Sequence, residues 1–339
     1  MGARLGIGVV GLGRMGAMHA RYLARGVPGA RIVAVADFDP DRARAMGAEL
    51  DVARVFGSAA ELAASPEVDA VLLATPSVRH PDDVIAVASA GKDVLCEKPL
   101  SLEVVGSEAA LAAVAKAGVR LQVGLMRRHD PDYLRAAERL AAGVVGRPVL
   151  FKSLQFDPEP PVFAFCDPRV SGGIFLDMGI HEFDLARWLM GDEVVEVHAW
   201  ASAAGVPELS SVGDYDSAVV NLRFATGATG TVELARTAVY GEDVRTEVIG
   251  SGGGVFVGRL PYSQGAFGTR GTIAIDAVDP SQMRFATAYA AQVQAFVLAL
   301  AEDRPVTPTG EDALAALRIS LAARASAERG GAVAVAAVE

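Results

Sequence analysis

Asp177 and His181 stand four residues apart in a segment whose apolar residues recur at helical spacing from residue 177 onward. Side chains at that spacing share one face of a helix, so the carboxylate and the imidazole are expected to face the same way. A neighbouring carboxylate orients an imidazole and raises its basicity, and a neutral histidine accepts a hydroxyl proton near pH 7. The pair suits alcohol oxidation; a capping acid beside a satisfied histidine is the alternative interpretation.

Lys98 is one of only four lysines and follows the short apolar run Asp93–Cys96. An ammonium group can share a proton with a substrate hydroxyl, and desolvation lowers its pKa, a property that arginine lacks. Lys98 is therefore a candidate member of a proton relay. The alternative is an exposed ion pair with a nearby carboxylate.

No cysteine and no third carboxylate converges on Asp177 and His181 in the sequence, so we expect no metal site and no zinc-dependent chemistry. Asp184 and Arg187, further along the same segment, have positions typical of an exposed helix surface.

A glycine-rich loop follows the first apolar run, with Gly11, Gly13 and Gly16 in the G-x-G-x-x-G spacing. The first glycine permits a tight turn, the second lets the backbone approach a pyrophosphate, and the third allows close packing of helix on strand. The N-terminus of the next helix then faces the phosphates. The pattern predicts a dinucleotide site, and a simple strand-to-helix corner is the alternative.

Asp37 ends the second apolar run, about twenty residues beyond the loop, where a carboxylate accepts hydrogen bonds from the adenosine ribose. A carboxylate there also repels a 2′-phosphate, so NAD is expected rather than NADP, while Arg42 and Arg44 leave NADP possible. An ordinary turn residue beside Asp39-Pro40 is the alternative.

Short apolar runs alternate with helical patterns up to residue 125, which predicts a Rossmann-type, doubly wound parallel sheet. Strands are expected at 5–10, 31–37, 70–74, 93–96 and 120–124, and helices at 14–26, 40–50, 58–64, 81–90 and 101–117. Ligands bind beyond the carboxyl ends of such strands. The residues that follow the later strands are Thr75, Pro76, Ser77, His80, Glu97, Lys98, Pro99, Met126 and Arg127.

Longer strand-like runs dominate after about residue 150, several with alternating apolar and polar residues. Alternation is typical of an antiparallel sheet with one solvated face. We therefore expect a 1–125 NAD-binding Rossmann domain and a 126–339 α+β domain with a large, mostly antiparallel open sheet for substrate binding and oligomerisation. Its predicted strands are 194–203, 216–224, 230–238 and 245–250, and its predicted helices 289–302 and 309–329.

The composition fits a folded globular protein, with 339 residues, 51% hydrophobic and 21% charged. The net charge is −10 and the basic residues are scattered, which argues against a nucleic-acid partner. No apolar run is long enough to cross a membrane. Two distant cysteines, Cys96 and Cys166, suggest no disulfide, so a cytoplasmic location is expected.

The sequence resembles the family of glucose–fructose oxidoreductase and inositol 2-dehydrogenase proteins (Gfo/Idh/MocA) over essentially its whole length. Four motifs in order carry the resemblance: Gly11-Leu12-Gly13-Arg14-Met15-Gly16 with His19, Ala74-Thr75-Pro76-Ser77 with His80, Glu97-Lys98-Pro99-Leu100, and Asp177 with His181.

Within the family the chain is most similar to inositol dehydrogenases. The resemblance implies oxidation of a ring secondary hydroxyl of a cyclitol, of the myo- or scyllo-inositol type, to the ketone, with hydride transfer to nicotinamide C4 of NAD. It implies that His181 is the general base, that Asp177 orients it, and that Lys98 donates a hydrogen bond that also positions the substrate oxygen.

The same resemblance implies a set of binding residues. The expected cofactor contacts are Gly11, Gly13, Arg14, Met15, Gly16, Asp37, Thr75, Pro76, His80 and Glu97. The expected substrate contacts are Met126, Arg127, Asp157 and Tyr240, together with the three catalytic residues. Relatives are commonly dimers or tetramers, so a homo-oligomer, with a homotetramer as one form, is expected.

Two departures from the inositol pattern keep other substrates open. His129 stands where the inositol enzymes more often have an aromatic residue, and 162–166 inserts an apolar stretch. Dehydrogenation of an aldose or another sugar is one alternative, and a cycle in which tightly held NAD is reduced and reoxidised is another. A non-catalytic NAD sensor is a third, because a Rossmann domain can bind cofactor without reacting it.

Overall fold

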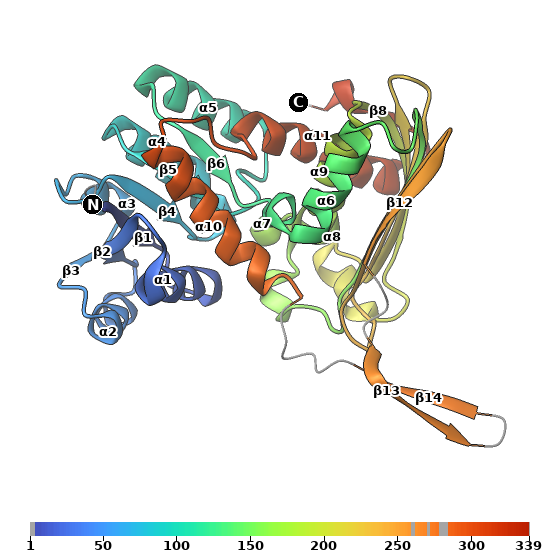
Figure 1. Ribbon diagram of the computed structural model, residues 1–339, viewed down its shortest axis with the longest axis horizontal. Helices are drawn as coiled ribbons and strands as arrows, with labels where there is room; N and C mark the ends of the chain where they lie inside the picture. Colours follow the sequence, from blue (N-terminus) through green and yellow to red (C-terminus); the bar gives the residue numbers. More distant parts are fainter. Residues whose placement is uncertain (1–3, 259–261, 270–271, 278–283, 339) are drawn as a thin grey trace. The chain divides into compact units, whose positions relative to one another are not determined.

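The computed structural model describes residues 4–258, 262–269, 272–277 and 284–338 (Figure 1). The chain forms two compact units. The first comprises residues 1–129 and 287–317 with residue 339, and the second comprises 130–286 and 318–338. Within the described ranges, no helix combines the length and the apolar character that crossing a bilayer requires.

The first unit contains a parallel sheet in the strand order β3-β2-β1-β4-β5-β6, which is the expected Rossmann order. Its strands are β1 (Leu5–Val10), β2 (Ala30–Ala36), β3 (Arg54–Phe56), β4 (Ala70–Leu73), β5 (Asp93–Cys96) and β6 (Leu121–Val123). Strands buried on both faces are continuous apolar runs, and every residue of β4 is buried.

Helices connect these strands on both faces of the sheet. They are α1 (Arg14–Gly26), α2 (Pro40–Leu50), α3 (Ala59–Ala63), α4 (His80–Ser89) and α5 (Val104–Ala117), with single turns η1 (Ser77–Arg79) and η2 (Met126–His129). The termini follow ordinary capping chemistry: Asp39 accepts hydrogen bonds from the amides of Asp41 and Arg42 at the start of α2.

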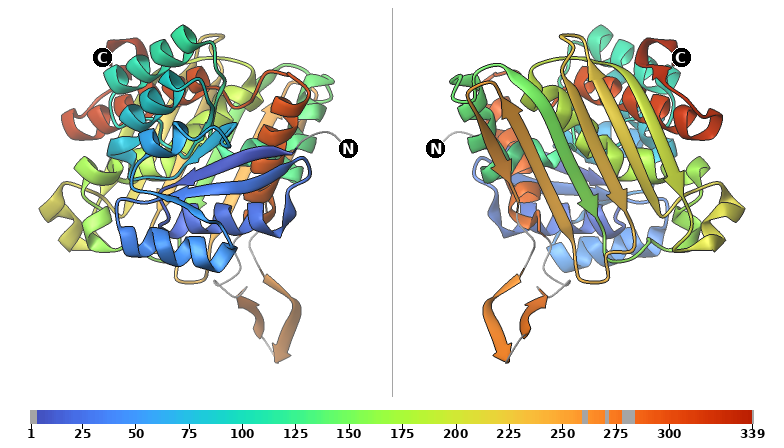
Figure 2. Two further views of the ribbon diagram at one scale, coloured as in Figure 1. Left: turned by 90° about the vertical axis from the view of Figure 1, so that its left-hand side faces the viewer. Right: turned by 90° about the vertical axis from the view of Figure 1, so that its right-hand side faces the viewer.

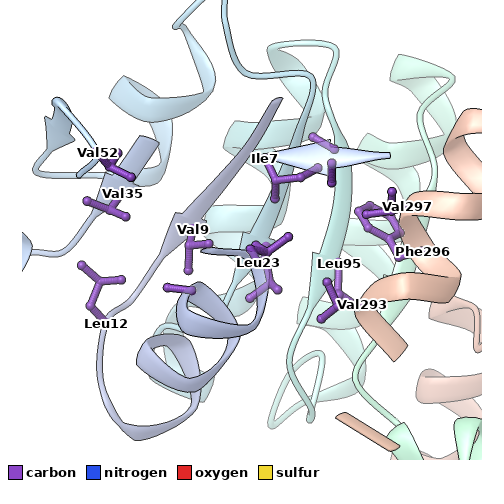
Figure 3. Close-up of a cluster of buried hydrophobic side chains, with 14 of the residues drawn as sticks. Ile7, Val9, Leu12, Leu23, Val35, Val52, Leu95, Val293, Phe296 and Val297 are labelled. Atoms are coloured by element: carbon purple, nitrogen blue, oxygen red, sulfur yellow. The ribbon is translucent and has the colours of Figure 1, made fainter. Parts of the chain in front are cut away.

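A late segment of the chain completes the core of the first unit. Helix α10 (Ala286–Ala301) places Val293, Phe296 and Val297 in one apolar cluster with Ile7 of β1 and Leu95 of β5 (Figure 3). The unit boundary therefore differs from the one expected after residue 125, because the apolar residues of α10 belong to the core of the first unit.

The second unit is built on a seven-stranded sheet in the order β12-β11-β7-β10-β9-β8-β15. Only β7 and β10 pair in parallel, so the expected mostly antiparallel sheet is confirmed. The strands are β7 (Pro148–Phe156), β8 (Val194–Ser202), β9 (Ser217–Phe224), β10 (Thr229–Ala235), β11 (Asp243–Gly250), β12 (Gly253–Val257) and β15 (Val333–Ala334); β13 (Tyr262–Thr269) and β14 (Thr272–Ala277) form a separate hairpin.

One face of this sheet is covered by helices and the other is open (Figure 2, right). Residues along β9 alternate between buried and exposed, as the sequence pattern predicts for such a sheet. The helices assigned to this part of the chain are α6 (Pro131–Ala141), α7 (Pro168–Ser171), α8 (Gly173–Asp177), α9 (Gly179–Met190) and α11 (Gly310–Arg329), of which α11 begins in the first unit; the turns are η3 (Phe163–Phe165), η4 (Pro207–Val212) and η5 (Val335–Ala337).

Candidate functional site

The glycine loop has the geometry of a phosphate cradle. A Cβ on Gly16 would lie 1.6 Å from the carbonyl oxygen of Gly11, and Gly11 itself has φ +82°. A Cβ on Gly13, by contrast, would meet no protein atom within 4 Å. The fold therefore requires glycine at positions 11 and 16. At Gly13 the space next to the first-turn residues Arg14 and Met15 is open, so a pyrophosphate can approach the protein backbone there.

Asp37 closes this loop from the end of β2. Its buried carboxylate accepts a hydrogen bond from the amide of Leu12 at 2.6 Å and one from Asp39 at 2.9 Å. Arg42 Nη1 lies 3.2 Å from the same carboxylate. Asp37 is thus more than a turn residue, because it fixes the loop, and Arg42 is engaged by carboxylates in this structure.

The loops after β4 and β5 are joined by His80. Its Nδ1 lies 2.7 Å from the carbonyl oxygen of Pro99, and its Nε2 lies 2.8 Å from that of Thr75. Burial lowers the pKa of His80 below its ordinary value, outweighing the two carbonyls that raise it. Because both ring nitrogens face backbone, His80 is placed to hold the two loops together, while the exposed Pro76 lies on the surface of the first loop.

Glu97 directly precedes Lys98 and is paired with a histidine of α1. His19 Nε2 is 2.6 Å from Glu97 Oε1, and both side chains are buried. Burial alone would raise the pKa of Glu97. The hydrogen bond and charge of His19 and the charge of Lys98 together lower it by more, so the pKa lies below its ordinary value and the carboxyl is ionised. The backbone amide of Lys98 donates to Glu97 Oε2 at 3.3 Å, so Glu97 also restrains the backbone at Lys98. His19 shares the buried face of α1 with Gly16 and Leu23, and its place in this apolar helical pattern could have indicated from the sequence that it is buried.

Lys98, Met126 and Arg127 follow the adjacent strands β5 and β6 and so share one edge of the sheet. Lys98 is half-buried, at the cis peptide bond to Pro99. Met126 and Arg127 are buried in the turn η2. The first unit thus collects its predicted residues at the carboxyl ends of the strands, as doubly wound sheets require.

His129, the residue that departs from the inositol pattern, is buried in the first unit. Burial lowers its pKa from 6.5 to about 4, while a hydrogen bond to the backbone of Thr307 raises it and Arg128 lowers it. Its Nε2 is buried with no hydrogen-bond partner among the described residues. His129 is therefore a neutral packing residue at pH 7.

Acidification from pH 6.5 to 4 is expected to cost the folded protein about 3 kcal/mol through His129. The lowered pKa means that the unfolded chain binds a proton here that the folded chain refuses, so stability is present above pH 6.5 and declines as the pH falls toward 4. Urea unfolding at pH 7 and pH 4.5 should show a smaller decline for His129→Phe than for the wild type. Equal declines in the two proteins would contradict this assignment.

In the second unit Asp177 and His181 lie on two consecutive helices and not on one. Helix α8 ends at Asp177, and α9 begins at Gly179, with the amide of His181 donating to the carbonyl of Met178 at 3.2 Å. The predicted helix from residue 177 was wrong at this junction. His181 is buried in the first turn of α9, whereas the Asp177 side chain is 20% exposed.

A buried polar network fixes α9 beside His181. The Glu182 carboxylate accepts from the Ser153 hydroxyl, which lies 2.8 Å from the hydroxyl of Thr246, and that oxygen lies 2.8 Å from the hydroxyl of Tyr133. Asp184, expected on the helix surface, is 2% exposed, so that prediction was wrong. Helix α9 packs against the sheet and other helices on most sides, which an amphipathic pattern does not foretell.

Arg236, which the sequence patterns did not single out, connects to Asp177. It follows β10, is fully buried, and places Nη2 3.3 Å from Asp177 Oδ2, while Nη1 donates to Asp214. The sequence feature that could have pointed to Arg236 is its position directly after the apolar strand β10. A buried guanidinium needs carboxylate partners, and here it has two.

Asp157 and Tyr240 lie at the same edge of the second sheet. Phe156 at the end of β7 pairs with Ala235 of β10 on one side and with Asp243 of β11 on the other. Asp157 and Arg236, which come directly after these paired strands, and the turn that contains Tyr240 therefore lie at the same end of the sheet. The Tyr240 hydroxyl donates to Asp243 at 3.3 Å, and burial raises the pKa of Tyr240. The second unit therefore gathers Asp157, Asp177 and Tyr240 around one strand end.

The strand order, glycine loop and Asp37 of the first unit are typical of a dinucleotide-binding domain. The family model described as "Oxidoreductase family, NAD-binding Rossmann fold" matches residues 5–125, and the GFO/IDH/MocA C-terminal domain matches residues 133–256. The chain belongs to the GFO/IDH/MocA family of oxidoreductases, and its cofactor is NAD. The resemblance expected from the motifs is confirmed.

Relatives span nearly the whole chain. The chain is 37% identical over 322 residues to scyllo-inositol 2-dehydrogenase (NAD(+)) of Bacillus subtilis, covering 95% of this chain and 94% of the relative. It is 39% identical over 329 residues to myo-inositol 2-dehydrogenase of Thermotoga maritima, covering 95% and 96%.

Solved structures agree. A probable dehydrogenase from Thermotoga maritima superposes with a TM-score of 0.93 at 37% identity, covering 99% of this chain and 100% of that one. Scyllo-inositol dehydrogenase from Lactobacillus casei, with bound NAD(H) and scyllo-inositol, gives a TM-score of 0.91 at 29% identity, covering 98% and 99%.

Proposed function

We propose that this protein is an NAD-dependent inositol 2-dehydrogenase that oxidises a ring secondary hydroxyl of a myo- or scyllo-inositol type cyclitol to the ketone. The observation that carries the proposal is the full-length similarity to enzymes of that name together with Lys98, Asp177 and His181 in their motifs. We assign NAD binding to the first unit and the general base, His181, to the second.

The chain's own residues would act on the hydroxyl. His181 accepts the hydroxyl proton, Asp177 orients the imidazole and stabilises the imidazolium that forms, and Lys98 donates a hydrogen bond to the substrate oxygen. When bound, NAD accepts the hydride at nicotinamide C4. Met126, Arg127, Asp157 and Tyr240 hold the other hydroxyls, and a pocket built from such donors and acceptors rejects a polyol that lacks one of them.

The test is NADH formation with a panel of inositol isomers and aldoses, each assayed with NAD and with NADP. We expect turnover with at least one inositol and NAD. Oxidation of an aldose alone would favour the sugar dehydrogenase alternative. No oxidation of any inositol would refute the proposed substrate.

The Lys98→Ala variant separates an enzyme from an NAD sensor. We expect kcat to fall by about 100-fold or more, because the donor to the substrate oxygen is lost, while NAD binding changes little. Lys116→Ala, on α5, is the matched control and should behave as the wild type. Unchanged turnover in Lys98→Ala would show that Lys98 is not part of the proton relay and would favour the alternative, an exposed ion pair with a nearby carboxylate.

We also propose a cytoplasmic homo-oligomer, either a dimer or a tetramer, formed through the open face of the second sheet. Trp200 on β8 and Val219 on β9 are cross-strand partners on that face and are 56% and 44% exposed. Exposed apolar pairs on a sheet face favour association. Trp200→Glu should shift the sedimentation coefficient toward a smaller species; an unchanged value would exclude this face.

A further inference from the structure

We propose that Arg236 is the positioning residue that holds Asp177 in its working orientation. The inference rests on the proposed function, in which Asp177 orients the general base. No motif carried Arg236, and its role follows from contacts within the second unit alone.

Arg236 is held in place by contacts other than the one with Asp177. The amide of Arg236 donates to the carbonyl of Asp216 at 2.8 Å, directly after β10. Its side chain is 0% exposed, and its Nη1 donates to Asp214, whose side chain is 1% exposed. A buried charge cannot leave its partner without a large desolvation cost, so the fork is locked in place.

The same guanidinium restrains both ends of the short helix α8. At the start of the helix, Asp214 Oδ1 accepts the amide of Ile174 at 2.9 Å. At its end, Arg236 Nη2 lies 3.3 Å from Asp177 Oδ2. A five-residue helix has little stability of its own, so its position depends on such anchors.

The charges of the cluster explain how the anchor can serve catalysis. Asp177 and Asp214 together carry two negative charges against one positive charge on Arg236. The second carboxylate, Asp177, can therefore also stabilise a cation that forms near it. Asp177 is the exposed member of the cluster, with 20% of its side chain accessible, so the buried pair holds it from behind.

A purely structural staple between β10 and α8 is the competing explanation. The two are distinguished by a charge-balanced double variant, Arg236→Met with Asp214→Asn. This variant removes one positive and one negative buried charge and keeps an amide oxygen to accept from Ile174. The control is Arg304→Met with Glu302→Gln, an exposed arginine–glutamate pair that follows α10.

We expect the double variant to fold, to bind NAD as the wild type does, and to lose about 100-fold in kcat, because a misplacement of about 1 Å near the reacting groups has that effect. Arg236→Lys should recover part of the loss, since an ammonium can still pair with a carboxylate. In an Asp177→Asn background the double change should lower kcat no further, because two residues that act as a unit are non-additive.

A structural staple predicts instead that the losses are additive in the Asp177→Asn background, or that kcat stays within about twofold of the wild type; either result overturns the proposal. If the double variant fails to fold, Arg236→Lys alone decides: kcat about tenfold lower at an unchanged KM for NAD supports positioning, and an unchanged kcat refutes it.

Crystal structures of the wild type and the double variant give a readout that needs no substrate. A displaced or multiply oriented Asp177 carboxylate in the variant supports the inference, and an unchanged one overturns it. If the wild type oxidises no polyol, the proposed function fails while this comparison still decides the role of Arg236.

Discussion

Replacement of His181 by alanine is expected to lower kcat by about 1,000-fold while leaving the Kd for NAD unchanged. His181 is the histidine in the second unit that the family motif places as base, and it is buried in the first turn of α9. Without its imidazole the hydroxyl proton has no acceptor as the hydride leaves. The substituted residue lies in the second unit, so the NAD-binding first unit keeps all of its own residues.

Stopped-flow NADH formation and fluorescence titration of NAD measure the two effects separately. Lys116→Ala, at an exposed lysine on α5, is again the control and should leave both values near those of the wild type. Asp177→Asn should keep His181 in place but lower kcat by about 100-fold or more, because an amide cannot stabilise the imidazolium. Full activity in His181→Ala would require another base.

Gly13→Ala should weaken NAD binding by about 10- to 100-fold without lowering stability. The added methyl meets no protein atom within 4 Å, and φ is −67°, so the folded chain accepts it. The methyl would instead fill the space that the pyrophosphate needs, an overpacking that costs about 1–3 kcal/mol. Isothermal titration with NAD and thermal unfolding measure the two quantities.

Gly16→Ala is the informative contrast. Its Cβ would lie 1.6 Å from the carbonyl oxygen of Gly11, so the loop backbone must move and stability should fall by about 3 kcal/mol or more. If Gly13→Ala binds NAD as tightly as the wild type does, the loop is a simple corner and the cradle interpretation fails.

The Rossmann half of the fold was predictable because its strands are buried on both faces and therefore form continuous apolar runs. The predicted strand 93–96 and the predicted helix 40–50 coincide with β5 and α2. Strand β3 was missed because it has three residues, lies at the sheet edge and is largely exposed. Helix α6 was missed although Asp130 and Pro131 carry its start signals.

The site was predictable where function dictates residue type at a strand end, as for Lys98 and Asp37. It was not predictable where two distant segments satisfy each other's buried charge. His19 pairs with Glu97 and Arg236 with Asp214 only through the tertiary fold, and no sequence motif indicated that these residues would pair. Local patterns carry no information about such pairs.

The return of α10 to the first sheet makes that unit discontinuous along the chain. During translation, the face of β1 and β5 that Val293, Phe296 and Val297 cover stays exposed until most of the protein has been made. A truncated chain that ends near residue 125 would present this apolar surface to water and is expected to aggregate. In a nascent chain, the cofactor-binding half can therefore mature only after the half to which we assign the catalytic base has left the ribosome.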